Sequence, residues 1–310
     1  MKGEKIWQDG GVGSGAGALG GRWLLRRRCW SCGRPRGLGL VSWGGSGEDR
    51  VDLSASLPDA GIFVSYIDVG QGDSAFVSCG EDTLLIDAGV SSEGETVVDY
   101  LRSLGVTELD YVVCTHAHED HCGGLDDVIA AFDVGTLFAP YTEFDASGAF
   151  TRFEDTAADK GLYVTVPELG AEFTLGGAVL EFVGPVSDWG DDLNDSSLVL
   201  RLEYGETAFL FTGDISAGPL EDCALIGGFD LGCDVLKLGH HGSSTSTDAE
   251  VLDLTHPSLA IACCGADNSY GHPHQEVVDL LAQRGITLLR TDTDGTIELV
   301  SDGKTVSRAA

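Results

Sequence analysis

A β-branched run passes into a histidine-rich loop over residues 112–124, which read VVCTHAHEDHCGG. Three of the chain's eight histidines fall within six residues here, at His116, His118 and His121, with Asp120 beside them. A buried strand that ends before the first histidine would present these side chains to an open cleft. Neutral imidazole and carboxylate are the ligands that Zn²⁺ prefers in catalytic sites, and similar sets hold Mn²⁺ or Fe. The stretch predicts a metal site in which His116 and His118 reach one ion, and Asp120 and His121 reach a second.

Polar side chains also follow strand-like segments elsewhere in the chain. Asp214 ends an apolar run, so a core element would hold its carboxylate in place to bridge two ions. His240 and His241 follow a second apolar run, and His272 lies in a short stretch that reads NSYGHP. Residues 67–74 read IDVGQGDS, a strand followed by a glycine-containing turn. Each segment predicts functional side chains at a strand end.

Taken in their order along the chain, from residues 67–74 to residues 268–273, these five motifs resemble those of the metallo-β-lactamase-fold hydrolases. They are similar in particular to the hydrolase domain of ComEC-type DNA-uptake proteins, here free-standing, over residues 61–303. The resemblance implies an α/β (α+β) fold, a four-layer αββα sandwich with helices on both outer faces. It also implies two divalent ions, Zn²⁺ or Mn²⁺, with Asp214 as the bridge. The ligands that it implies are His116, His118, Asp120, His121, Asp214, His240 and Asn194.

One position departs from the pattern of many relatives, which supply a further histidine before the Asp214 strand. No histidine occurs between Cys122 and Gly239, and residues 193–198 read LNDSSL, similar to an Asn-x-x-Ser pattern of the ComEC branch. Asn194 or Asp195 would then donate an oxygen to the first ion. An oxygen in place of a nitrogen ligand favours Mn²⁺, or a weakly held Zn²⁺.

The sequence leaves several roles near the metals open. Either His240 or His241 binds an ion; we favour His240, with His241 pointing elsewhere as a substrate or supporting contact. His272 would bind a phosphate oxygen or protonate a leaving group. Asp120, His241 and His272 are the catalytic candidates. Asp73 is a candidate to orient a metal-bound histidine, and Lys237, in mid-strand, to pair with a core carboxylate.

Charge and hydropathy restrict the class of protein. The formal net charge is −32, and residues 51–310 hold nine Lys and Arg against 46 Asp and Glu, or −37. Such an acidic body repels phosphate backbones, which weakens a nucleic-acid-binding interpretation. No run of about 18 apolar residues occurs, so we expect no transmembrane segment. The nine cysteines form no disulfide framework and indicate buried thiols in a reducing compartment, so we expect a cytoplasmic protein.

Residues 1–60 differ from the remainder in composition. Fourteen glycines, four of the five tryptophans and the run Arg26-Arg27-Arg28 fall within the first 50 residues, with no hydrophobic periodicity. We expect a disordered Gly/Arg-rich tail over residues 1–60 and one hydrolase domain over residues 61–310. If translation starts at a different position from the one given, a secreted protein is the alternative to a cytoplasmic one. Removing residues 1–55 should leave fold and activity intact.

The leading hypothesis is a metal-dependent phosphodiesterase in which a metal-held hydroxide attacks phosphorus in line. The substrate would be a small phosphoester or a single-stranded nucleic acid; the sequence indicates no protein partner. One alternative is hydrolysis of carboxylic esters, thioesters or lactams on the same fold. The other is a non-catalytic binding module with a decayed site.

Overall fold

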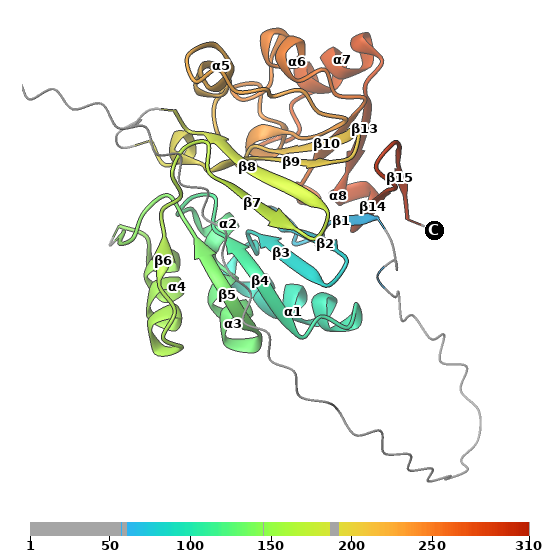
Figure 1. Ribbon diagram of the computed structural model, residues 1–310. Helices are drawn as coiled ribbons and strands as arrows, with labels where there is room; N and C mark the ends of the chain where they lie inside the picture. The colour runs from blue at the N-terminus through green and yellow to red at the C-terminus, as the bar shows by residue number, and fades with distance from the viewer. Residues whose placement is uncertain (1–56, 58–60, 145, 187–191, 310) are drawn as a thin grey trace, which may run out of the picture. The chain divides into compact units, whose positions relative to one another are not determined.

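The computed structural model describes residues 57, 61–144, 146–186 and 192–309, all of which lie in the unit Asp52–Ala310 (Figure 1). The expected tail therefore falls almost wholly outside the described residues, as do Cys29 and Cys32. The seven cysteines within the described residues are all buried free thiols, as expected.

Eight strands form the first sheet, in the spatial order β15-β14-β1-β2-β3-β4-β5-β6. Strands β3 to β6 run parallel, and the remaining pairs are antiparallel. The bounds are β1 Ile62–Tyr66, β2 Ala75–Cys79, β3 Asp82–Ile86, β4 Glu108–Val113, β5 Asp133–Phe138, β6 Val164–Thr165, β14 Ile297–Ser301 and β15 Val306–Arg308. The central strands β1 and β2 are buried on both faces, which explains why they read as continuous rather than alternating apolar runs.

Seven strands form the second sheet, in the order β13-β12-β11-β10-β9-β8-β7. Strands β10 to β13 are parallel, and β7 to β10 pair antiparallel. The bounds are β7 Glu172–Leu175, β8 Ala178–Gly184, β9 Val199–Tyr204, β10 Thr207–Phe211, β11 Val235–Lys237, β12 Leu259–Ala262 and β13 Thr287–Arg290. Both sheets thus have a parallel half, whose strands end at a common edge.

Helices cover the outer face of each sheet, and the two sheets pack on each other. Helices α1 (Gly94–Ser103), α3 (Leu125–Ala131) and α4 (Gly148–Asp159) share one apolar core with the first sheet. Helices α5 (Ala217–Leu225), α6 (Ala249–Thr255) and α7 (Gln275–Arg284) share another with the second sheet. A third core, which includes Leu84 and Phe209, lies between the sheets. Figure 1 shows the resulting four layers, with α5, α6 and α7 on one side and α1, α3 and α4 on the other.

This architecture confirms the αββα sandwich that the motifs predict. Strands β14 and β15 extend the first sheet beyond β1 and are not predicted from the sequence. Lys237 is the last residue of β11 rather than a mid-strand residue. In the part of the chain that the structure describes, none of the helices combines the length and apolar character needed to span a bilayer.

Candidate metal centre

The site lies where the parallel strands of both sheets end. Strands β3 and β4 end side by side in the first sheet, as do β10 and β11 in the second. The amide of Leu198 donates to the carbonyl of Thr115 over 2.9 Å, which ties the strand entering the second sheet to the loop leaving β4. The Ser197 hydroxyl lies 3.3 Å from His116 Nδ1 and accepts from the amide of Asp214 over 3.1 Å. One hydroxyl thus connects the metal-ligand candidates of the two sheets.

The loop after β4 brings the predicted histidines together. His116 and His121 are fully buried, and the short helix α2 (Glu119–Cys122) carries Asp120 and His121. His116 Nε2 lies 3.0 Å from His118 Nδ1, so both ring nitrogens face the same point. Two imidazoles arranged in this way fit a shared ion, as the sequence analysis expects.

Asp87, which the sequence does not mark as a site residue, holds His121 in place. Its carboxylate accepts from the Thr115 amide over 2.8 Å and from the Thr115 hydroxyl over 2.7 Å. The same carboxylate lies 2.8 Å from His121 Nδ1, so Nδ1 carries the proton and Nε2 is free for an ion. The sequence signal that could have identified Asp87 is its position at the end of an apolar strand, directly before Ala88-Gly89.

Asp214 lies at the centre of the cluster and is 2% exposed. Its Oδ1 is 3.2 Å from His121 Nε2, and its Oδ2 is 3.5 Å from His241 Nε2 and 3.8 Å from His240 Nε2. Although Oδ1 and His121 Nε2 are close, neither buried atom has a hydrogen-bond partner among the described residues. Buried polar atoms without partners are costly, and an ion between them would satisfy both. The two atoms therefore fit the metal position that the sequence predicts.

The adjacent histidines occupy different environments. Both have a positive φ, 48° for His240 and 57° for His241, and this turn separates their rings. His241 does not point away from the site, contrary to the sequence analysis: it is 1% exposed and its Nε2 lies 3.2 Å from Asp120 Oδ2. The His240 side chain is 31% exposed and faces the same carboxylate of Asp214 from the cavity side. Both imidazoles thus lie within reach of an ion at Asp214.

Asn194 and Asp195 have separate roles. Asp195 Oδ1 accepts from the amide of Ser216 over 2.9 Å, so it stabilises the loop before α5. Asn194 lines the cavity, and its buried Oδ1 has no hydrogen-bond partner among the described residues. Of the two oxygen donors, Asn194 is the one that fits an ion.

The cluster has an excess of negative charge. Four carboxylates (Asp73, Asp87, Asp120 and Asp214) lie near one ammonium group, that of Lys237. Burial would lower the pKa of His121, but the carboxylates, led by Asp214, outweigh it and hold that pKa well above its ordinary value. Burial would also lower the pKa of His241, but Asp214 and Asp120 outweigh it and raise that pKa to about 9. A cluster that binds protons so strongly also suits divalent cations.

A cavity of about 340 Å³ opens over these groups. The exposed ring of Tyr270 stacks on His272 at 5.6 Å between ring centroids. Burial and the charges of His241 and His240 lower the pKa of His272 to about 4. His272 is therefore neutral near pH 7. The lining residues are Gln71, His118, Glu119, Asp120, Asn194, Asp214, His240, His241, Tyr270 and His272.

The structure thus brings together every predicted site residue. His116, His118, Asp120, His121, Asp214, His240 and His241 surround one centre, while Asn194 and His272 line the cavity beside it. In addition, Asp73 joins His121, Asp214 and His241 in a group whose ligand atoms all lie within 4.8 Å of one another. Asp73 contacts His241 Nδ1, as the sequence analysis expects, and Lys237 pairs with a core carboxylate, which is Asp73.

Comparison with known proteins agrees with these motifs. The family model of the metallo-beta-lactamase superfamily matches residues 67–266. The chain is 32% identical to ComE operon protein 3 of Bacillus subtilis over 76% of its own length and 32% of the relative. It is also 32% identical to competence protein ComA of Neisseria gonorrhoeae, over 85% of its own length and 36% of the relative. The chain spans about a third of the length of these curated relatives.

Solved structures show the same fold at low identity. YhfI of Bacillus subtilis, a metallo-beta-lactamase fold protein, is 12% identical and matches with a TM-score of 0.51 over 77% of this chain and 99% of its own. CmlA of Streptomyces venezuelae, a diiron beta-hydroxylase, is 16% identical with a TM-score of 0.51 over 82% of this chain and 55% of its own. From its motifs, its αββα layers and the family match, the chain belongs to the metallo-β-lactamase superfamily.

Proposed function

We propose that this chain is a metal-dependent phosphodiesterase that takes two divalent ions, Zn²⁺ or Mn²⁺. The observation that carries the proposal is the cavity over Asp214, which combines ion-ligand groups with polar and histidine side chains. A phosphodiester carries its charge on oxygens that bound ions and histidine N–H groups can contact. These groups support a phosphate ester, and the carboxylic ester, thioester and lactam alternatives are outcomes of the test below.

The protein's own residues would divide the work between ion binding and substrate binding. Asp214 would hold both ions, together with His116 and His118 for one ion and Asp120 and His121 for the other. Two divalent ions held there supply Lewis acidity and an activated water nucleophile. His272, neutral near pH 7, and the half-exposed His240 would donate hydrogen bonds to the non-bridging phosphate oxygens.

The size of the substrate follows from two opposing observations. The relatives are named for competence and, in Haemophilus influenzae, for recombination, which supports a nucleic-acid phosphodiester. The body of this chain carries −37, and a polynucleotide would meet repulsion outside the cavity. We therefore favour a nucleotide-sized ester or the end of a single strand as the substrate.

A substrate panel tests the proposal. The protein, purified without chelator, is assayed with a small phosphodiester, single-stranded DNA, a carboxylic ester, a thioester and a β-lactam. We expect turnover of the small phosphodiester with little dependence on salt, and steep salt dependence for any cleavage of DNA. Turnover of an acyl substrate without turnover of either phosphodiester would contradict the proposal. No turnover of any substrate, with full metal content, would favour a binding module.

A further inference from the structure

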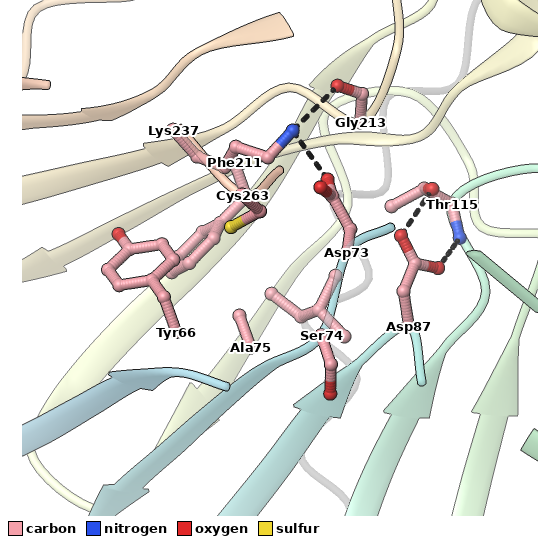
Figure 2. Close-up of a pocket in the computed structure, with 11 residues that line it drawn as sticks. Tyr66, Asp73, Ser74, Ala75, Asp87, Thr115, Phe211, Gly213, Lys237 and Cys263 are labelled. Carbon is pink, nitrogen blue, oxygen red and sulfur yellow. Dashed lines mark hydrogen bonds and ion pairs between the residues drawn. The ribbon is translucent and has the colours of Figure 1, made fainter. Parts of the chain in front are cut away.

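A buried lysine lies directly beneath the metal centre. Lys237 is 3% exposed, and its Nζ is 2.5 Å from Asp73 Oδ2. The same ammonium donates to the carbonyl of Leu238 over 2.8 Å and to that of Gly213 over 3.3 Å. Figure 2 shows these contacts of Lys237 with Asp73 and Gly213 at the wall of a small cavity. All three protons of the ammonium group thus have acceptors, so its position is fixed.

Asp73 divides its carboxylate between two partners. Oδ2 binds Lys237, and Oδ1 lies 3.1 Å from His241 Nδ1. Its backbone is also tied to the metal loop, because its amide donates to the carbonyl of Asp120 over 3.0 Å. The carbonyl of Cys263, 3.0 Å away, is a second acceptor for His241 Nδ1. With its proton on Nδ1, His241 has Nε2 free to face Asp120 and Asp214.

The position of Asp73 creates a second possibility. Its carboxylate belongs to the group with His121, Asp214 and His241 whose ligand atoms lie within 4.8 Å of one another. Without Lys237, this carboxylate is near enough to turn from His241 and bind an ion itself. The outcome would be a site with one more oxygen ligand, in which His241 Nδ1 keeps only the Cys263 carbonyl as its acceptor.

We propose that Lys237 is a positioning residue that holds Asp73 on His241 and out of the ion's ligand set, which preserves a nitrogen-rich site. Nitrogen ligands favour Zn²⁺, and additional carboxylate oxygens favour Mn²⁺. Lys237 thereby sets the metal preference without touching a metal. The inference rests on the ion site of the proposed function and not on the substrate, because its test measures ion binding.

The test compares Lys237→Met with the double variant Asp73→Asn/Lys237→Met. The single variant frees a charged Asp73. The double variant removes both charges, and its amide oxygen can still accept from His241 Nδ1. Lys160→Met is the control: the exposed Lys160 also donates to backbone carbonyls, those of Ile129 and Phe132 over 2.7 Å, away from the site. Metal-free proteins are titrated with Zn²⁺ and with Mn²⁺ against a chromophoric chelator, and Co²⁺ spectra report the ligand set.

In Lys237→Met we expect the ratio of Zn²⁺ to Mn²⁺ affinity to fall about tenfold or more, with a changed Co²⁺ spectrum. The loss of an outer-shell partner changes ion affinity by about 10–100-fold. The double variant should therefore be clearly distinct from the single variant and lie within about threefold of the wild-type ratio. Lys160→Met should keep the wild-type ratio. A purely structural role for Lys237 predicts that Lys237→Met loses affinity for Zn²⁺ and for Mn²⁺ equally. That result would overturn the inference, as would an unchanged ratio of the two affinities.

If Lys237→Met does not fold, Lys237→Gln, which also removes the charge but keeps a hydrogen-bond donor, takes its place. A lower ratio in Lys237→Gln that Asp73→Asn restores supports the inference, and a wild-type ratio in Lys237→Gln overturns it. A wild-type protein that binds ions with the expected preference but cleaves no phosphodiester would refute the proposed function and leave this inference standing.

Discussion

His121 Nε2 lies 3.2 Å from Asp214 Oδ1, and the two residues come from different sheets. His121 follows β4 of the first sheet, whereas Asp214 follows β10 of the second. An ion bound between them therefore joins the two halves of the sandwich as well as serving the chemistry.

Removing the metal should lower the melting temperature. An ion present at about 100 times its dissociation constant stabilises the native state by about 2.7 kcal/mol, which corresponds to roughly 5–10 °C for a domain of this size. Melting curves with and without EDTA measure the effect. Asp214→Asn is the control, because a protein that has lost one or both ions should respond less to EDTA. A wild-type curve that EDTA leaves unchanged would show that no ion links the sheets.

Asp87→Ala should cost both stability and ion affinity. It leaves the Thr115 amide and hydroxyl without their acceptor and frees the His121 ring. We expect about 10–100-fold weaker ion binding, together with a loss of about 1–3 kcal/mol for each buried group left without a partner.

Asp110→Ala provides a matched comparison for Asp87→Ala. Asp110 accepts from the amide of Thr83 over 2.9 Å and from its hydroxyl over 3.3 Å, but contacts no histidine. This variant should lose stability and keep the wild-type ion affinity. Titration calorimetry and chemical denaturation separate the two effects, and equal ion affinities in both variants would refute the orienting role of Asp87.

Gly72→Ala should disturb the metal loop more than Gly70→Ala. Both glycines have a positive φ, 149° for Gly72 and 68° for Gly70, so alanine is strained at either position. A Cβ on Gly72 would lie 2.4 Å from the Asp120 carbonyl oxygen, whereas a Cβ on Gly70 meets nothing within 4 Å. We expect roughly 1 kcal/mol of destabilisation for Gly70→Ala, with ion affinity retained. Gly72→Ala should lose more stability and bind its ions more weakly; equal effects of the two variants would contradict this packing.

The sequence predicts the parts of the fold that depend on local pattern. Apolar runs that end in His116, Asp214 or His240 mark both the strands and the site, because side chains at the ends of parallel strands meet at one edge. The strands β14 and β15 escaped prediction since β14 pairs with β1, more than 230 residues earlier in the chain. Short strands at such a distance carry little local signal.

The missed features of the site have the same origin. The contact of Asp87 with His121 joins segments remote in sequence, and Asp87 does not differ in type from the chain's many other acidic residues. Lys237 was expected to pair with a core carboxylate, but its partner Asp73 is equally remote in sequence. The orientation of His241 depends on left-handed backbone at two successive non-glycine residues, which is uncommon and which sequence pattern does not reveal. The sequence therefore identifies His240 and His241 as a pair of site residues but does not show which of the two rings is buried.

The most direct test of the central claim is Asp214→Asn, with metal content and phosphodiester turnover measured on the same sample. The amide keeps the shape of the side chain but removes the charge that offsets two neighbouring cations, so at least one ion should be lost. Turnover should fall roughly 10³-fold while the fold is retained. His256→Asn is the control, because His256 is an exposed, left-handed residue outside the site and asparagine tolerates that backbone. Loss of metal and turnover in Asp214→Asn alone is the predicted result. Near-normal turnover with full metal content in Asp214→Asn would contradict the bridging role of Asp214 and the mechanism built on it.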